Sequence, residues 1–336
     1  MNIELAYPFK TRELLEIRDN FSITRDVRSN LLFENSEILQ PSISVVIPTF
    51  KAPYLLQAIE SVNIQENAPS FEVVIVDNDP DADIEKIKQF LGDKKHIYRY
   101  FRNEKNIGMV GNWNRCIELA LSENIVFLHS DDVMSIGCLK KLWDIRKCVE
   151  PTAAILGHEN FMNAEGVVFQ QYSCREKFLF LKLKPYYKYT RYSQFIMEYD
   201  NGCCEMINKS VAIKIGGFDD NVYPSIDGQF FAKYHAEAPI YRASIVVRCC
   251  RVAVNTSKIV VNKYRACIYY MKIAVINKYF NGNCFLKYIV GLEAKNAYFP
   301  MFGDSNERYV LRWYERLILD LNKKAYRLSL IHISEP

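Results

Sequence analysis

The chain has 336 residues, of which 49% are apolar and 24% charged, and its formal net charge is +4. This composition is that of a globular protein with a sizeable core, and it excludes a disordered chain. Among the ten cysteines there is no Cys-x-x-Cys pair, and no apolar run approaches the ~18 residues of a membrane span, so the sequence argues against a zinc knuckle, a thioredoxin-type site and a transmembrane protein.

The N-terminal residues carry charges and no long apolar core, which argues against a signal peptide and favours a cytoplasmic location. Residues 1–42 show weak periodicity and are predicted to form a helical or extended lead-in. From Ile43 a β-branched run reaches Pro48, and apolar residues then recur at helical spacing from Leu55 to Val62. This pattern predicts one strand followed by one helix.

The order of strand and helix then repeats along the chain. Phe71–Asp77 is typical of a buried strand, and residues 84–91 carry a helical apolar stripe. A third strand is predicted near 97–101, a helix over 110–121, and a fourth strand in the apolar run that begins at Ile125. This alternation predicts an α/β fold with a Rossmann-like, mostly parallel sheet flanked by helices.

Polar side chains follow three of the predicted strands. Thr49 ends the first, Asp77 the second, and Asp131 and Asp132 the fourth. Ligands of open α/β sheets bind beyond the carboxyl ends of the strands, and carboxylate oxygens select hard ions such as Mg or Mn that can bridge to a diphosphate. A second interpretation is that Ser130 to Asp132 only caps the following helix.

Two common nucleotide-binding motifs are missing from the chain. No Gly-x-Gly-x-x-Gly follows the first strand, and there is no Gly-Lys-Ser/Thr loop. This argues against a nicotinamide enzyme and a P-loop ATPase. A nucleotide held by carboxylates and a metal ion remains.

Several motifs, taken together, resemble the family 2 glycosyltransferases of GT-A fold in order and spacing, over about Ser44 to Ala238. The runs that carry the resemblance are Val45–Phe50, Val74–Asn78, Asn106-Ile107-Gly108 followed by Asn114, Leu128–Asp132, Ile215–Asp219 and Ile226-Asp227. The resemblance implies a GT-A domain at 43–261, preceded by the lead-in and followed by a helical C-terminal appendage at 262–336.

The resemblance also implies an activity. The chain would move a sugar from a nucleotide-diphospho-sugar, expected to be a UDP-sugar, to a saccharide or lipid-linked acceptor with inversion, in surface polysaccharide biosynthesis. Asp77 would accept a hydrogen bond from the imide of the base, although a carboxylate there can equally form an Asx-turn. The donor-binding residues implied are Pro48, Thr49, Asp77, Asn78, Gly108, Asn114, His129 and Ser130.

The metal motif of the family is Asp-x-Asp, and it falls on His129-Ser130-Asp131 in this chain. Asp131 keeps the role of binding Mn or Mg. His129 departs from the family, because an imidazole can hydrogen-bond but brings no fixed negative charge. Asp132 either ligates the same ion or orients its ligands.

Asp227 is the expected general base for the acceptor hydroxyl. It stands at the start of a predicted helix, where the family has Glu-Asp and this chain has Ile226-Asp227. A carboxylate at that place can take the proton as the hydroxyl oxygen attacks the sugar. It can also be a plain helix N-cap.

A different class of function stays open beside this one. His129 and Ile226 depart from the family motifs and favour the hypothesis of a catalytically inactive module that binds sugar nucleotides. Asp131 and Asp227 argue for an enzyme. A nucleotidyltransferase is a weaker alternative, because residues 48–53 supply no glycine-rich basic loop.

The C-terminal part is basic. Residues 264–328 hold eleven Lys or Arg and five Asp or Glu, a local net charge of +6 against +4 for the whole chain. Its helices either lie on the inner face of a membrane, where a lipid-linked acceptor would be found, or pack on the domain with a solvated basic face. No nucleic-acid-binding module accompanies them, so no nucleic-acid partner is expected.

Overall fold

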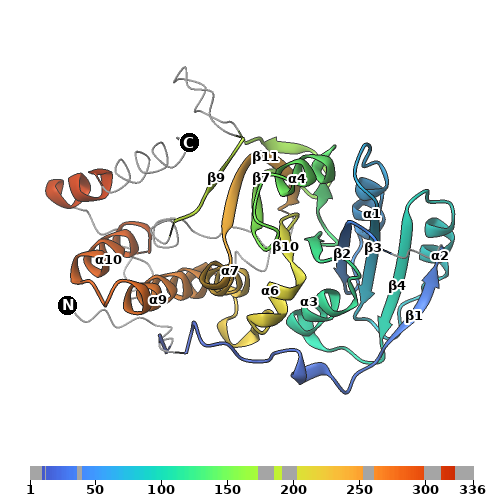
Figure 1. Cartoon of the computed structure of the whole chain (residues 1–336), viewed down its shortest axis with the longest axis horizontal. Coiled ribbons are helices and arrows are strands. Elements are labelled where there is room, and N and C mark those ends of the chain that lie inside the picture. Colours follow the sequence, from blue (N-terminus) through green and yellow to red (C-terminus); the bar gives the residue numbers. More distant parts are fainter. Residues whose placement is uncertain are drawn as a thin grey trace.

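The structure of the chain is a computed structural model that describes residues 10–11, 13–35, 40–172, 185–190, 203–252, 261–298 and 312–321. Figure 1 shows a twisted sheet with helices on both of its faces and further helices gathered at one end. The strands are β1 (Ser29–Glu34), β2 (Ile43–Thr49), β3 (Phe71–Asp77), β4 (Ile97–Asn103), β5 (Asn124–Phe127), β6 (Val133–Met134), β7 (Ala154–Met162), β8 (Val168–Gln170), β9 (Tyr186–Lys188), β10 (Met206–Asn208) and β11 (Ile240–Arg251).

The helices occupy the stretches between these strands and the C-terminal part. They are α1 (Leu55–Asn63), α2 (Glu85–Gly92), α3 (Gly108–Leu119), α4 (Cys138–Arg146), α6 (Lys209–Lys214), α7 (Ile226–Glu237), α9 (Val261–Tyr279) and α10 (Cys284–Tyr298), with short 3-10 turns at Ser22–Thr24 and Asp220–Val222. A further helical stretch covers 313–321. The predicted alternation of strands and helices is confirmed.

One mixed sheet contains all of these strands in the order β1-β4-β3-β2-β5-β10-β7-β11-β6, with β8 beside β7 and β9 beside β11. Neighbouring strands from β4 to β5 run parallel, as do β7 and β11. Every residue of β2 and of β3 is buried, as expected for parallel strands covered on both faces. The predicted α/β fold is therefore present.

Alternate residues of these strands serve two hydrophobic cores. Val46 and Val74 point to a core shared with α3, α6, α7 and α9, whereas Val45 and Val73 point to a core shared with α1 and α4. This follows from the two-residue period of a strand. The helices on the two faces hold the strand ends in one register, which positions the residues that follow them.

The predicted fourth strand is present as β5, and it is short. β5 ends at Phe127, and residues 128–132 form a turn before β6. The neighbour of β5 on one side is β10, whose Met206 pairs with Val126. β10 has only three residues, which are too few for a periodic pattern, so the sequence does not predict this strand.

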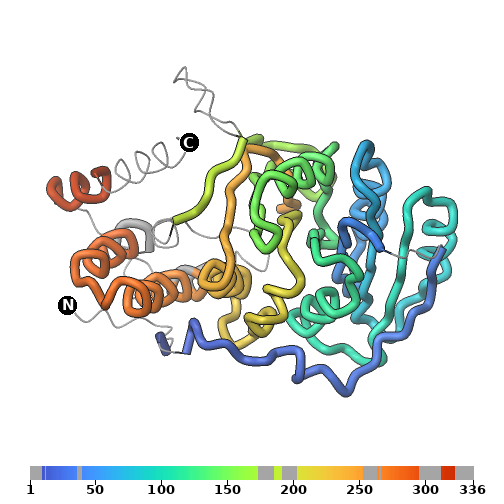
Figure 2. Tube along the Cα trace, in the orientation of Figure 1, coloured from blue at the N-terminus to red at the C-terminus, as the bar shows by residue number. Residues whose placement is uncertain are grey.

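The N-terminal segment forms what we call the strap, residues 13–35. Figure 2 shows it running along one side of the molecule from beside α7 to β1, at the opposite end of the sheet. The Gln229 side chain donates to the Leu14 carbonyl (2.9 Å) and Asn20 Nδ2 to the Gly216 carbonyl (3.0 Å). β1 then pairs antiparallel with β4. The described part of the lead-in thus belongs to the sheet and its core.

The C-terminal helices are attached through α9. Cys267 and Met271 of α9 lie in the core that contains α7, whereas Ile289, Val290 and Leu319 form a small separate cluster with the far side of α9. Among the described helices, none combines the length and the apolar character needed to cross a bilayer.

Candidate active site

The ends of β2, β3 and β5 meet at one edge of the sheet. Thr49 is paired with Asp77 across the β2–β3 ladder, and Val46 with Phe127 across β2–β5. The Leu128 amide donates to the Val46 carbonyl (2.9 Å), so the turn after β5 starts beside the last residues of β2. Thr49, Asp77 and the turn that carries His129 to Asp132 therefore follow neighbouring strand ends, whereas Gly108 and Asn114 lie in α3.

Asp77 is buried and already hydrogen-bonded. Tyr100 donates its hydroxyl to Oδ2, and the Asp79 amide donates to Oδ1 (3.0 Å), which is an Asx-turn. Burial raises the pKa of Asp77, and these two hydrogen bonds act in the opposite direction. Pro48 and Thr49 are buried next to it. A carboxylate oxygen has more than one lone pair, so Asp77 can accept a further donor.

Two predicted donor-binding residues hold loops together. Asn78 donates to the Asn106 side chain (2.8 Å) and to the Gly108 carbonyl (3.2 Å). Asn114 donates to the Phe218 carbonyl (3.0 Å) and accepts from its amide (2.8 Å). Both amides are buried and fix the approach of α3 and of the turn before Asp219, so their observed contacts are to the protein itself.

A row of aromatic rings connects the turn after β5 with α7. The His129 ring stacks on Trp113 (5.4 Å between centroids), and the Phe218 ring meets Trp113 edge-on (5.1 Å) and stacks on Phe230 (4.2 Å). Asp227 lies one turn before Phe230, in the first turn of α7. The row therefore brings the expected base and the expected metal motif to one region of the molecule.

The two adjacent carboxylates after β5 have different surroundings. Asp131 is exposed. Asp132 is 2% exposed; it accepts from Arg248 Nη1 (2.5 Å) and from the Arg251 amide (2.9 Å). Burial raises the pKa of Asp132 to about 7, although the positive Arg248 lowers it. Asp132 thus anchors the turn to β11, whereas the carboxylate of Asp131 stays available to a ligand.

Arg248 and Arg251 are two buried cations that sequence reasoning missed. Arg248 bridges Asp132 to Glu159 (2.5 Å), and Arg251 Nε donates to the Asp131 carbonyl (2.9 Å). The three arginines of β11, which are Arg242, Arg248 and Arg251, were the available signal, because a buried arginine needs carboxylates or carbonyls as partners.

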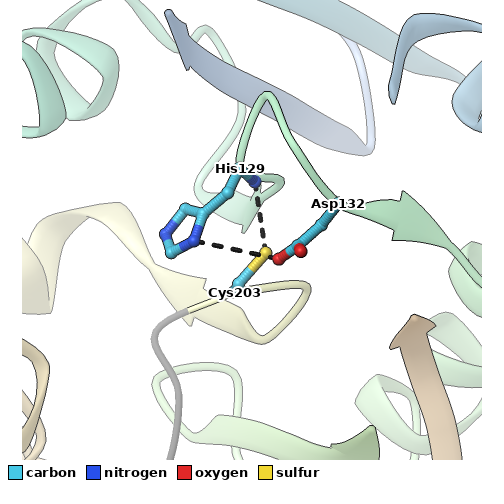
Figure 3. A group of neighbouring side chains, drawn as sticks. All are labelled: His129, Asp132 and Cys203. Atoms are coloured by element: carbon cyan, nitrogen blue, oxygen red, sulfur yellow. Dashed lines mark hydrogen bonds and ion pairs between the residues drawn. The ribbon is translucent and has the colours of Figure 1, made fainter. Parts of the chain in front are cut away.

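Cys203 is the third residue that the sequence did not single out. Figure 3 shows its side chain converging with those of His129 and Asp132, and the His129 amide donates to its sulfur (3.1 Å). Burial alone would raise the pKa of Cys203, but a hydrogen bond from Cys204 and the positive charges of His129 and Arg248 hold it well below its usual value. Burial opposes the charge of His129, yet Cys203 and Asp132 raise its pKa to about 9.

Asp227 is half-buried in the first turn of α7. Glu205 is 3% exposed, follows the Cys203-Cys204 turn, and has one carboxylate oxygen without a hydrogen bond. Burial raises the pKa of Glu205 far above its usual value, and the negative charge of Asp227 adds to this. Glu205 and Asp227 therefore lie close enough for their charges to interact, although Glu205 is buried and Asp227 only half-buried.

Comparison with known proteins places this arrangement in a family. The model described as glycosyl transferase family 2 matches residues 44–216, which is half of the chain. The chain belongs to glycosyl transferase family 2. The match covers the strand ends, residues 129–131 where a metal motif is expected, and Gly216 of this family 2 chain, and Asp227 follows soon after it.

Relatives of this family 2 chain include an uncharacterized glycosyltransferase, MJ1057, of Methanocaldococcus jannaschii, 24% identical over 200 residues, with 59% of this chain and 66% of the relative covered. A second is the GalNAc(5)-diNAcBac-PP-undecaprenol beta-1,3-glucosyltransferase of Campylobacter jejuni, 26% identical over 240 residues, with 70% and 74% covered. An uncharacterized protein, MT1568, of Mycobacterium tuberculosis is 26% identical over 206 residues, with 58% of this chain covered. The match spans 62% and 66% of the length of MT1568 and MJ1057.

The fold is similar to that of solved structures of S. aureus TarS. S. aureus TarS 1-349 matches with a TM-score of 0.57 at 17% identity, with 82% of this chain and 77% of that chain covered. The same protein in complex with UDP-GlcNAc matches with a TM-score of 0.56 at 15% identity, with 86% and 81% covered. At this level of sequence identity the similarity shows a shared fold and nothing about the activity.

Proposed function

We propose that the chain is an inverting glycosyltransferase that moves a sugar from a UDP-sugar to a saccharide or lipid-linked acceptor, in the assembly of a surface polysaccharide. The observation that supports the proposal is the aromatic row that runs from His129, in the turn after β5, to Phe230, one turn after Asp227 in α7. Family membership supports transfer of a sugar.

The donor side of the proposal rests on Asp77 and on the solved relatives. TarS was solved with UDP and with UDP-GlcNAc. In this chain the Asp77 carboxylate, held by Tyr100 and the Asp79 amide, would accept the imide N–H of uracil, with Pro48 and Thr49 beside it. A carboxylate fixed by two protein donors is oriented before the base arrives, so little entropy is lost on binding.

Asp131 would hold a divalent ion, Mn or Mg. Its exposed carboxylate is the hard oxygen ligand that these ions select, and Arg251 fixes its backbone carbonyl. When bound, such an ion supplies positive charge for the leaving diphosphate. Asp132, paired with Arg248, would keep the turn in place.

Asp227 would act as the general base. In a single displacement the acceptor hydroxyl loses its proton as its oxygen bonds to the anomeric carbon, while the bond from that carbon to the diphosphate breaks. The proton goes to Asp227, and the electron pair of the broken bond goes to the diphosphate. Attack from the face opposite to the leaving group inverts the anomeric centre.

A lipid-linked acceptor is supported by two features. The Campylobacter relative is named for an undecaprenol-linked substrate. In this chain Trp313, Leu317 and Leu321 are exposed at four-residue spacing on one helix, with Arg316 on the same helix and Arg312 just before it. An apolar helix face flanked by basic residues suits an anionic membrane surface.

The test uses purified chain with a panel of UDP-sugars, Mn and candidate acceptors. Asp227→Asn should lower transfer by ~100-fold or more and leave UDP affinity nearly unchanged, because a base acts on the acceptor. The matched control is Asp220→Asn, since Asp220 is an exposed carboxylate seven residues earlier. Loss of UDP affinity and of stability in Asp227→Asn would make Asp227 a structural cap.

The rival function is a module that binds sugar nucleotides without turnover. It is favoured by Ile226, which is buried where the family has a Glu. UDP binding with no UDP release from any donor, in the presence of Mn and acceptor, would support the rival and reject the transferase.

A further inference from the structure

Three unlike metal-binding atoms converge in the turn after β5. A nitrogen of His129, an oxygen of Asp132 and the sulfur of Cys203 all lie within 4.8 Å of one another, and His129 Nδ1 is 3.9 Å from Asp132 Oδ2. Figure 3 shows the three side chains pointing toward one another from two different turns. We propose that His129, Asp132 and Cys203 form a binding site for a thiophilic divalent ion of the zinc class.

The ligand chemistry decides which ion the site would take. Mg and Mn prefer oxygen, whereas one imidazole, one thiolate and one carboxylate are a set that suits Zn²⁺ or Co²⁺. Ligand atoms around one tetrahedral zinc are roughly 3.5 Å apart, so three atoms that already lie within 4.8 Å of one another must move together by about 1 Å. The proposed site is therefore different from the Mn or Mg site that the transferase proposal assigns to Asp131.

The charges around the three residues favour a cation. Arg248 is shared between Asp132 (2.5 Å) and Glu159 (2.5 Å), so both carboxylates face the same guanidinium. When His129 is neutral, as a metal-binding imidazole must be, the two carboxylates outnumber the one guanidinium before the thiolate is counted. A divalent ion would neutralise that excess in a region where charge is poorly screened by water.

The ligands are also held by the backbone. The Arg251 amide donates to Asp132 Oδ1 (2.9 Å), and Oδ2, which accepts from Arg248 Nη1 (2.5 Å), faces His129 and has a further lone pair for an ion. The His129 amide donates to the Cys203 sulfur (3.1 Å), which keeps the sulfur against the turn. Hydrogen bonds of this kind fix ligand orientation in known metal sites. An ion here would link the turn after β5 to the turn before β10.

The experiment uses the full chain, reduced and freed of metal, titrated with Co²⁺ at mildly alkaline pH, because the ion competes with a proton for the His129 ring. The expected result is a near-ultraviolet thiolate-to-cobalt band together with tetrahedral visible bands, both displaced by one equivalent of Zn²⁺. Cys203→Ser should abolish the thiolate band, and His129→Ala should weaken Co²⁺ affinity at least tenfold.

Two control variants make the result decisive. Cys204→Ser changes a neighbouring buried thiol and should keep the band, and Asp131→Asn should also keep it, since Asp131 is outside the group. Retention of the band in Cys203→Ser, its loss in Asp131→Asn, or no cobalt band in the parent chain would each overturn the proposal. If Cys203→Ser does not fold, His129→Ala decides, because His129 is partly exposed. These readouts do not involve sugar transfer, so failure here leaves the proposed function standing.

Discussion

Asp131 and Asp132 are adjacent carboxylates whose substitution should change the free energy of unfolding by very different amounts. Asp132→Asn leaves the buried Arg248 with only Glu159 as a carboxylate partner, and breaking a buried ion pair costs about 3 kcal/mol of unfolding free energy. Asp131→Asn changes an exposed side chain and should stay within about 0.5 kcal/mol of the parent. Urea denaturation of both variants measures the contrast.

Ligand binding should show the reverse order. Asp131→Asn should lose Mn-dependent UDP affinity in calorimetry while its fold persists. Equal UDP affinity with and without a chelator would remove the ion from the donor site.

His158 on β7 predicts a pH dependence of stability. Burial lowers its pKa from 6.5 to about 4, and the positive Arg242 acts in the same direction. The unfolded chain therefore binds a proton at this position below about pH 6.5, whereas the folded chain does so only near pH 4. The contribution of His158 to the free energy of unfolding is therefore fully present above pH 6.5 and is lost as the pH falls toward 4.

The variant His158→Gln removes this titration. Between pH 6.5 and 4, its free energy of unfolding should fall less steeply than that of the parent chain. Parallel pH profiles of the two proteins would show that His158 makes no contribution.

At the scale of elements, the Gly216 turn and the strap depend on each other. Gly216 has φ +82°, and a Cβ there would lie 1.7 Å from the Arg18 carbonyl oxygen. Gly216→Ala should therefore displace the strap and cost at least about 2 kcal/mol, from left-handed strain and the clash with backbone. Thermal unfolding and proteolysis near Arg18 measure this.

Gly291→Ala is the matched control, since nothing lies within 4 Å of its added Cβ and it is within α10. It should stabilise the chain by up to about 1 kcal/mol. Equal effects of the two substitutions would mean that the strap does not depend on Gly216.

The same elements show how far the sequence predicts the structure. The β-branched runs of β2 and β3 and the stripe of α1 follow from local periodicity, because each is buried in a regular way. The site depends on pairs such as Asp132 with Arg248 and His129 with Cys203, which are 116 and 74 residues apart. Periodicity reports on a residue's own element, so it cannot tell which distant element will lie against it.

At the scale of the molecule, α10 should open locally before α9 and the sheet. Ile289 and Val290 of α10 belong to the small outer cluster, whereas Met271 of α9 is part of a main core. Local opening needs less free energy where fewer apolar groups are exposed. Hydrogen exchange at α10 amides should be faster than at those of α9 that face α7. Equal protection of both helices would mean that they open as one unit with the core.

The strap has a consequence for synthesis on the ribosome. Its Asn20 bonds to Gly216, 196 residues later, and its Leu14 carbonyl to Gln229, 215 residues later. A nascent chain that has not yet reached α7 therefore carries Leu14, Leu15 and Phe21 without these two contacts, although all three side chains are buried in the finished protein. The strap thus leaves the exit tunnel long before its partners in α7, and until then its apolar side chains are accessible to a ribosome-associated chaperone.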